Sequence, residues 1–147
     1  MSSQLWRRVF LVLSGLLALQ GAAWALFGSF DPLGWWDSRL AEALFGRPRL
    51  TAEETAVKRA VLVPLGATDA GFFLLGLLFA WRAERTGVRF VVGGLLAAVT
   101  VWYVLDSAVC WVIGLRFNVL WVNTPAALTL ALVLGGWWRA HELEASR

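Results

Sequence analysis

The stretch FVVGGLLAAVTVWYVLDSAVCWVIGL, residues 90–115, decides the fold, because Asp106 is its one charged side chain. A helix needs about 20 consecutive apolar residues to cross the hydrocarbon layer of a bilayer, which is roughly 30 Å thick. Residues 90–115 are therefore predicted to span a membrane. Further apolar runs of comparable length lie at 9–27, 60–81 and 117–138. The sequence thus predicts an all-α fold in one domain, residues 1–147: an integral membrane bundle of four transmembrane helices.

The overall composition supports this prediction. Apolar residues make up 59% of the chain and the mean hydropathy is +0.67, which is more apolar than a soluble domain with a hydrated surface. The 13 basic residues lie in short clusters between the apolar runs, so they are interpreted as determinants of topology, and no nucleic-acid partner is expected. Cys110 and His141 are the single cysteine and histidine, so the sequence predicts no metal site and no cofactor.

The longest connection between apolar runs, residues 28–59, is predicted to contain a short amphipathic helix that lies on the membrane surface. Its apolar residues recur at the spacing of one helix face, at Trp36, Leu40, Ala43 and Leu44. The pair Thr51 and Glu54 then has the spacing of a capping box, in which each side chain satisfies a backbone amide of the other residue. This pair predicts the start of a helix that continues into the second span.

The orientation follows from the loops. Basic residues divide almost evenly between the two sides, but acidic residues accompany them in 28–59, whereas the short loop 82–89 is predominantly basic. Short loops carry the most weight in the positive-inside rule, so both the N- and C-termini are predicted to be cytoplasmic and 28–59 to be the first extracytoplasmic loop. As an alternative for the first run, Ala23-Trp24-Ala25 resembles the cleavage site of a signal peptide.

Two carboxylates within the spans are the most informative polar residues. Asp69 and Asp106 each lie about 13 Å below the predicted outer surface, on antiparallel helices that follow each other in the chain. Gln20 and Asn123 place polar groups at a similar depth on the other two spans. If the carboxyl groups approach each other, they are expected to share one proton, and such a pair can bind a cation or relay a proton.

Aromatic residues on the third span would complete a cavity, because Trp102 and Tyr103 fall on the same helix side as Asp106. The candidate ligand or ion site therefore consists of Asp69, Asp106, Tyr103, Asn123, Gln20 and Trp102. Two alternatives remain open. The polar residues can join the helices by hydrogen bonds, with small neighbours such as Gly66 allowing close packing, or they can contact another subunit.

At the outer membrane interface, Arg116, Trp35 and Trp36 are candidates for contacts with lipid. Arg116 could instead pair with Asp31 or Asp37 from the long loop. The sequence contains no motif of a known catalytic site, so no catalytic residue is predicted.

Several short motifs follow the first apolar run in order: Leu26-Phe27-Gly28, Asp31-Pro32, Leu44-Phe45-Gly46, Thr51-Ala-Glu-Glu-Thr55 and the basic-to-glycine run 59–76. Over residues 9–105 this order resembles the DoxX-like small four-helix membrane proteins of bacteria, named after a subunit of a membrane quinone-linked oxidoreductase. The resemblance implies a location in the bacterial cytoplasmic (inner) membrane. It assigns no functional residue, because residues 106–125 match no motif of the family.

Three functions are compatible with these features. The first is a non-catalytic accessory or assembly subunit of a bacterial membrane complex, whose partners are the lipid bilayer and other membrane subunits or copies of itself. The second is a small-molecule binder or proton-coupled transporter that uses Asp69 and Asp106 in a cavity open to the outside. The third is a membrane enzyme acting on lipid or quinone, for which a carboxylate pair without a nucleophile is thin support.

Overall fold

The computed structural model describes residues 2–28, 31 and 33–146, and over these residues it contains helices and no strands. The elements in chain order are α1 (Ser3–Phe27), α2 (Trp35–Phe45), α3 (Ala52–Thr86), α4 (Val88–Val112), α5 (Arg116–Asn118), the π-helical turn η1 (Val119–Asn123) and α6 (Thr124–Ala145). Four segments are long and apolar enough to cross a membrane: Ser3–Phe27, Ala52–Thr86, Val88–Val112 and Arg116–Ala145. The predicted all-α fold with four long apolar helices is thus confirmed.

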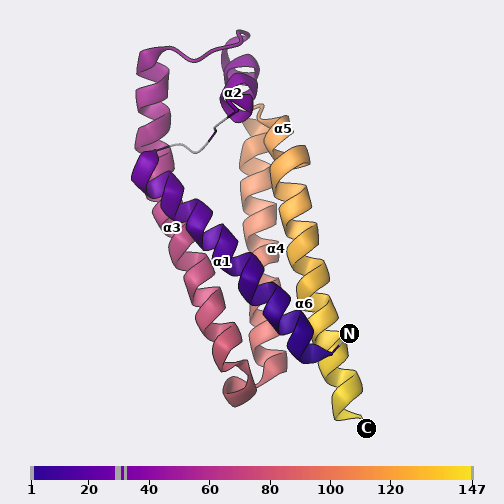
Figure 1. Ribbon diagram of the computed structural model, residues 1–147. Coiled ribbons are helices and arrows are strands. Elements are labelled where there is room, and N and C mark those ends of the chain that lie inside the picture. Colours follow the sequence, from indigo (N-terminus) through magenta and orange to yellow (C-terminus); the bar gives the residue numbers. More distant parts are fainter. Residues whose placement is uncertain (1, 29–30, 32, 147) are drawn as a thin grey trace.

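The four long helices form a closed ring in which α1 contacts α3, α3 contacts α4, α4 contacts α6 and α6 contacts α1. Both ends of the chain lie at one end of the bundle, and α2 lies at the other (Figure 1). In the same view α1 runs diagonally, from the outer part of α3 toward α6 near the chain termini. The end that carries α2 is called the outer end below, and the opposite end the inner end.

The helices extend beyond the predicted spans. The capping box forms as predicted, because Thr51 Oγ1 accepts the amide of Glu54 and Glu54 Oε2 accepts the amide of Thr51. Helix α3 therefore begins at Ala52, as the capping box predicts, and continues through residue 60 into the second apolar run. At the inner end the predicted loop 82–89 is helical except for Gly87, whose φ of 99° lies in a region that favours glycine. One residue thus reverses the chain between α3 and α4.

The closest helix contact joins α1 to α3 through Gly21 and Gly66. A Cβ atom added to Gly66 would lie 2.6 Å from the amide nitrogen of Ala25, and one added to Gly21 would lie 2.6 Å from the amide nitrogen of Ala70. Backbones approach this closely only where both helices carry small residues. The contact lies in the outer half of the bundle, at the level of Asp69, whose Cβ would be 3.0 Å from a Cβ on Gly21.

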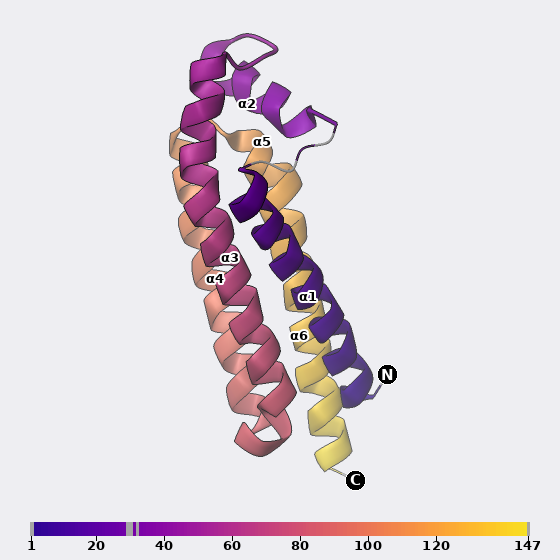
Figure 2. The ribbon, with the colours of Figure 1, turned by 60° about the vertical axis from the view of Figure 1, so that its left-hand side comes forward.

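The inner half of the bundle contains the main apolar core. Phe10, Val92, Leu134 and Trp137 belong to this core, and the indole of Trp137 is only 1% exposed. A smaller cluster lies at the outer end, beneath α2, and consists of Leu40, Cys110, Leu115 and Val119. Figure 2 shows α2 seated across the outer end of the bundle, where this second cluster lies.

Helix α2 falls in the loop where a short helix was predicted, but its apolar residues do not all face one way. Leu40 is 7% exposed and Trp36 packs against the same outer cluster, whereas Leu44 is 44% exposed and Ala43 is also exposed. The residues nearest the start of α2 thus contact the bundle. The placement of α2 on a membrane surface stays a prediction.

Candidate functional site

Asp106 on α4 is held by an amide from the π-helical turn η1. The Nδ2 atom of Asn123 donates to Asp106 Oδ2 at 2.6 Å and lies 3.2 Å from Ser107 Oγ. Asn123 is itself only 2% exposed, so this amide is removed from solvent. A buried polar group is costly unless it is hydrogen-bonded, and here each of the two residues satisfies the other.

The hydrogen bonds continue outward from Asn123 to α2. Asn118 Nδ2 donates to Asn123 Oδ1 at 3.2 Å, and Trp36 Nε1 donates to Asn118 Oδ1, also at 3.2 Å. An indole N–H can only donate, so each asparagine accepts through its oxygen and donates through its nitrogen, and every bond in this chain runs from Trp36 toward Asp106. The chain Trp36–Asn118–Asn123–Asp106, called the amide relay below, connects α2 with the interior of α4.

The π-helical turn η1 makes the amide relay possible. In a regular α-helix, residues five apart point about 140° away from each other, so Asn118 and Asn123 would not meet. A π-helical turn closes hydrogen bonds between residues five apart, as Thr124 N does with Val119 O, and such turns recur at functional sites. Pro125 gives a reason for the turn, because its ring crowds the carbonyl four residues before it in a regular helix.

Cys110 lies beside the amide relay and is 7% exposed. Asn118 Nδ2 lies 3.4 Å from its sulfur atom, and the thiol lies 3.7 Å from Asp106 Oδ2. Sequence reasoning missed Asn118 and Ser107 as members of this network. The one available signal was the pair of asparagines shortly before a proline, but their spacing of five does not match a helical face.

Asp69 on α3 differs from Asp106 in its surroundings. Its carboxyl group is half-buried and makes no hydrogen bond with the residues that the structure describes. It nevertheless interacts electrostatically with Asp106 across the bundle. The structure therefore places one carboxylate that is held by amides within electrostatic range of one that is not.

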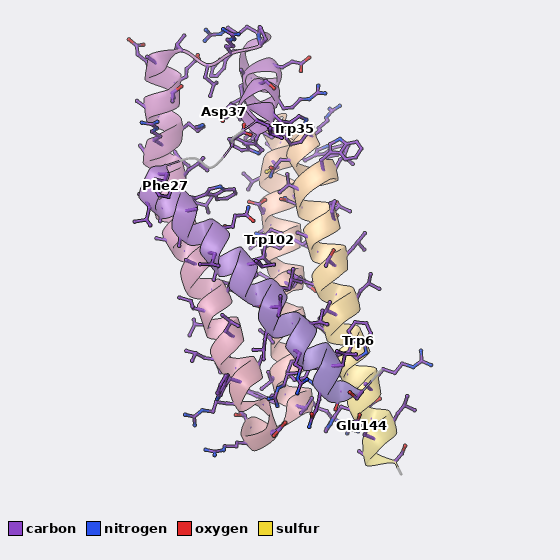
Figure 3. All side chains as sticks on the ribbon, viewed as in Figure 1. Trp6, Phe27, Trp35, Asp37, Trp102 and Glu144 are labelled. Atoms are coloured by element: carbon purple, nitrogen blue, oxygen red, sulfur yellow. The ribbon has the colours of Figure 1, made fainter. Side chains whose placement is uncertain are left out.

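The other candidate residues lie in separate environments. The hydroxyl of Tyr103 lies 3.1 Å from Thr124 Oγ1, which joins α4 to α6. Trp102 packs against the main apolar core, midway along the bundle (Figure 3). Gln20 is exposed on α1. Of the six candidates, Asp106 and Asn123 are thus joined by a hydrogen bond, and Asp69 interacts with Asp106 through its charge.

The residues at the outer interface form two sets of contacts. Trp36 belongs to the amide relay. The ring of Trp35 contacts the ring of Phe117 edge-on, with 6.0 Å between the ring centres. The guanidinium of Arg116 lies 5.2 Å from the ring centre of Trp111, a distance typical of a cation–π contact.

The two acidic residues considered as partners for Arg116 bind other groups. Asp37 forms an ion pair with Lys58, whose Nζ lies 2.6 Å and 2.7 Å from the two carboxylate oxygens. Asp31 accepts the backbone amides of Trp35 and Asp37 at the start of α2, at 3.1 Å and 2.9 Å. Lys58 is 7% exposed, and sequence reasoning did not identify it as an anchor for α2. Figure 3 shows Asp37 and Trp35 together at the outer end.

Within the described ranges, no group of three or more His, Cys, Asp or Glu side chains is arranged to hold a metal ion. His141 lies near the end of α6, at the inner end of the bundle, far along the chain from Cys110 and Ser107. The geometry thus supplies hydrogen bonding and charge near Asp106, but no histidine to activate a nucleophile there.

A comparison of the chain with models of known protein families finds no match, and the searches of curated proteins and of solved structures find none either. The resemblance to DoxX-like proteins therefore stays a prediction. What the structure establishes is an all-helical chain with four helices long and apolar enough to cross a membrane.

Proposed function

We propose that this chain is a non-catalytic accessory or assembly subunit of a membrane complex, inserted in the bacterial inner membrane with both termini in the cytoplasm. The amide relay is the observation that supports this role best. The polar atoms of Asn118 and Asn123 are used to hold α2 on the bundle, so these two residues have a structural role. The ion pair of Lys58 with Asp37 anchors α2 from the other side.

In this proposal α2 forms a rigid platform at the outer membrane surface. Several large apolar side chains around it remain exposed, including Leu33 at 90%, Leu44 at 44% and Phe45 at 46%. Exposed apolar residues beside the ends of membrane spans suit either the lipid interface or a neighbouring subunit. The platform is the part of the molecule through which assembly is proposed to occur.

The test is purification of the tagged chain from its own membranes in a mild detergent, followed by native mass spectrometry. We expect a complex with a second subunit in fixed stoichiometry, and not only the 16.2 kDa chain. Leu33→Asp together with Phe45→Asp should release that subunit, whereas Phe90→Asp, a change of an equally apolar and exposed residue at the inner end, should not. Isolation of the monomer alone from unmodified membranes would contradict the assembly role.

A second function is supported by Asp69. Because Asp69 makes no hydrogen bond with the described residues and interacts with Asp106, the two carboxylates suit a shared proton or a bound cation. The amide relay occupies Asp106 Oδ2 and leaves Oδ1 for this exchange. The alternative proposal is therefore proton-coupled binding or transport in the outer half of the bundle.

Proteoliposomes containing a pH-sensitive dye would separate the two functions. If the chain moves protons, a lumen-negative membrane potential should drive protons inward and acidify the lumen. Asp69→Asn should abolish this acidification while the protein remains folded. Glu53→Gln, an exposed carboxylate at the start of the same helix, is the matched control and should have no effect. Equal traces from the parent chain and Asp69→Asn would exclude coupling through Asp69.

A further inference from the structure

A cleft of about 370 Å³ opens at the outer end of the bundle, between α2 and the start of the last span. Trp35 and Arg39, one turn apart on α2, form one wall. Phe117 on α5 and Trp121 in η1 form the facing wall. We call this space the outer cleft. Each wall thus supplies two side chains, and three of the four are aromatic.

The two walls are fixed relative to each other by contacts beside the lining residues. Trp36 follows Trp35 in the chain and Asn118 follows Phe117, and these two neighbours are joined by the first hydrogen bond of the amide relay. The rings of Trp35 and Phe117 also meet edge-on at 84°. The outer cleft is therefore formed before any ligand binds, and little ordering remains to be done on binding.

The chemistry of the outer cleft combines one cation with exposed rings. Arg39 pairs with Glu42 at 3.1 Å, but this pair is exposed, so it holds the guanidinium weakly. A guanidinium has five donors in a planar fork that matches the oxygens of a phosphate, and most of them remain for a ligand. Trp35 and Trp121 are 43% and 71% exposed, and such rings prefer the depth of lipid head groups.

We propose that the outer cleft binds the head group of a phospholipid, with its phosphate on Arg39 and its glycerol and first acyl carbons against Trp35, Phe117 and Trp121. This inference rests on the membrane placement proposed above. Phe117 and Trp121 begin the last apolar segment, Arg116–Ala145, so the cleft lies where that span enters the membrane. At this depth the bilayer supplies phospholipids, whose phosphate groups are joined to apolar acyl chains.

The test uses the full-length chain, delipidated in mild detergent, titrated with phosphatidylglycerol and observed by native mass spectrometry. Arg39→Gln should weaken lipid retention about tenfold, as expected when a charge-assisted hydrogen bond to phosphate is lost. Arg49→Gln removes an equal charge from the same loop but outside the cleft, and should change retention little.

A second pair of variants tests the aromatic wall. Trp121→Leu should also weaken retention, whereas Trp81→Leu should not, although both tryptophans are 71% exposed and they lie at opposite ends of the bundle. Equal retention by the Arg39 and Arg49 variants would overturn the proposal. Displacement of the lipid by an equal concentration of glycerol phosphate would show that the cleft selects free phosphate and not lipid.

Fractionation of cells distinguishes a failure of the proposed membrane placement from a failure of the outer cleft proposal alone. If the parent chain is extracted from membranes by alkaline carbonate, the proposed function fails together with the cleft. If the chain resists extraction but Arg39→Gln retains lipid like the parent, only the outer cleft proposal fails.

Discussion

Gly66 lies where the backbones of α1 and α3 come closest. In Gly66→Ala the new Cβ would lie 2.6 Å from Gly21 O and from the amide of Ala25, so one helix must shift. We expect a loss of about 1–3 kcal/mol in the free energy of unfolding, the usual cost of overpacking. Gly71→Ala on the same helix is the control, since nothing lies within 4 Å of its Cβ. Thermal unfolding in detergent measures both, and equal melting temperatures would show that the contact is not tight.

Ser14 on α1 has a hydroxyl that is fully buried and has no hydrogen-bond partner among the described residues. We therefore expect Ser14→Ala to stabilise the chain by about 1 kcal/mol, because an unpaired polar group no longer has to be buried. Ser107→Ala should have the opposite sign, since Ser107 Oγ lies within hydrogen-bond distance of Asn123. Chemical unfolding of both variants measures the change in the free energy of unfolding. A destabilised Ser14→Ala chain would show that this hydroxyl has a hydrogen-bond partner.

At the level of single residues, the sequence predicts Asp69, Asp106 and Asn123 because polar groups inside apolar runs are rare and conspicuous. It does not predict that Asn118 joins them. That contact depends on a π-helical turn, and the sequence periods used for helices and strands contain no spacing of five. Gln20 is equally conspicuous in the sequence but lies on the exposed side of α1, because its direction depends on how α1 crosses its neighbours.

Among the elements, α2 depends most on polar contacts for its position. Trp36→Phe keeps the ring in the outer cluster but removes the indole N–H that binds Asn118. We expect faster amide hydrogen exchange throughout α2, with about 1 kcal/mol of local stability lost. Trp35→Phe is the matched control, because Trp35 contacts Phe117 only through its ring. Equal exchange in the two variants would mean that packing alone holds α2.

The lengths of the elements illustrate what apolar runs leave out. Each of the four runs falls on one of the four long apolar helices, since hydrophobicity reports the part of a helix that suits lipid. They miss the polar extensions of α3, where charged residues are compatible with a helix outside the hydrocarbon layer. Only the capping box at Thr51 and Glu54 marked the true start, because it reports helix geometry and not hydrophobicity.

For the whole molecule, the orientation in the membrane can be tested with cysteine labelling. Arg49→Cys places a thiol in the exposed segment after α2, and Ser146→Cys places one after α6. With cytoplasmic termini, a membrane-impermeant maleimide should label the first variant in intact cells and the second only after lysis. The parent chain is the control, because its one thiol, on Cys110, is 7% exposed. The reverse labelling pattern would invert the proposed topology.

The length of α3 makes the position of α2 depend on the thickness of the bilayer. Its 35 residues extend about 52 Å, whereas a bilayer with its head groups is about 40–45 Å thick. In the membrane placement proposed above, its outer turns, which carry Lys58 and so support α2, project out of the hydrocarbon layer. The length of this projection sets the distance of α2 from the hydrocarbon layer. In a thicker bilayer we expect hydrophobic mismatch to draw α2 toward the acyl chains, so lipid chain length would tune how this platform meets its surroundings.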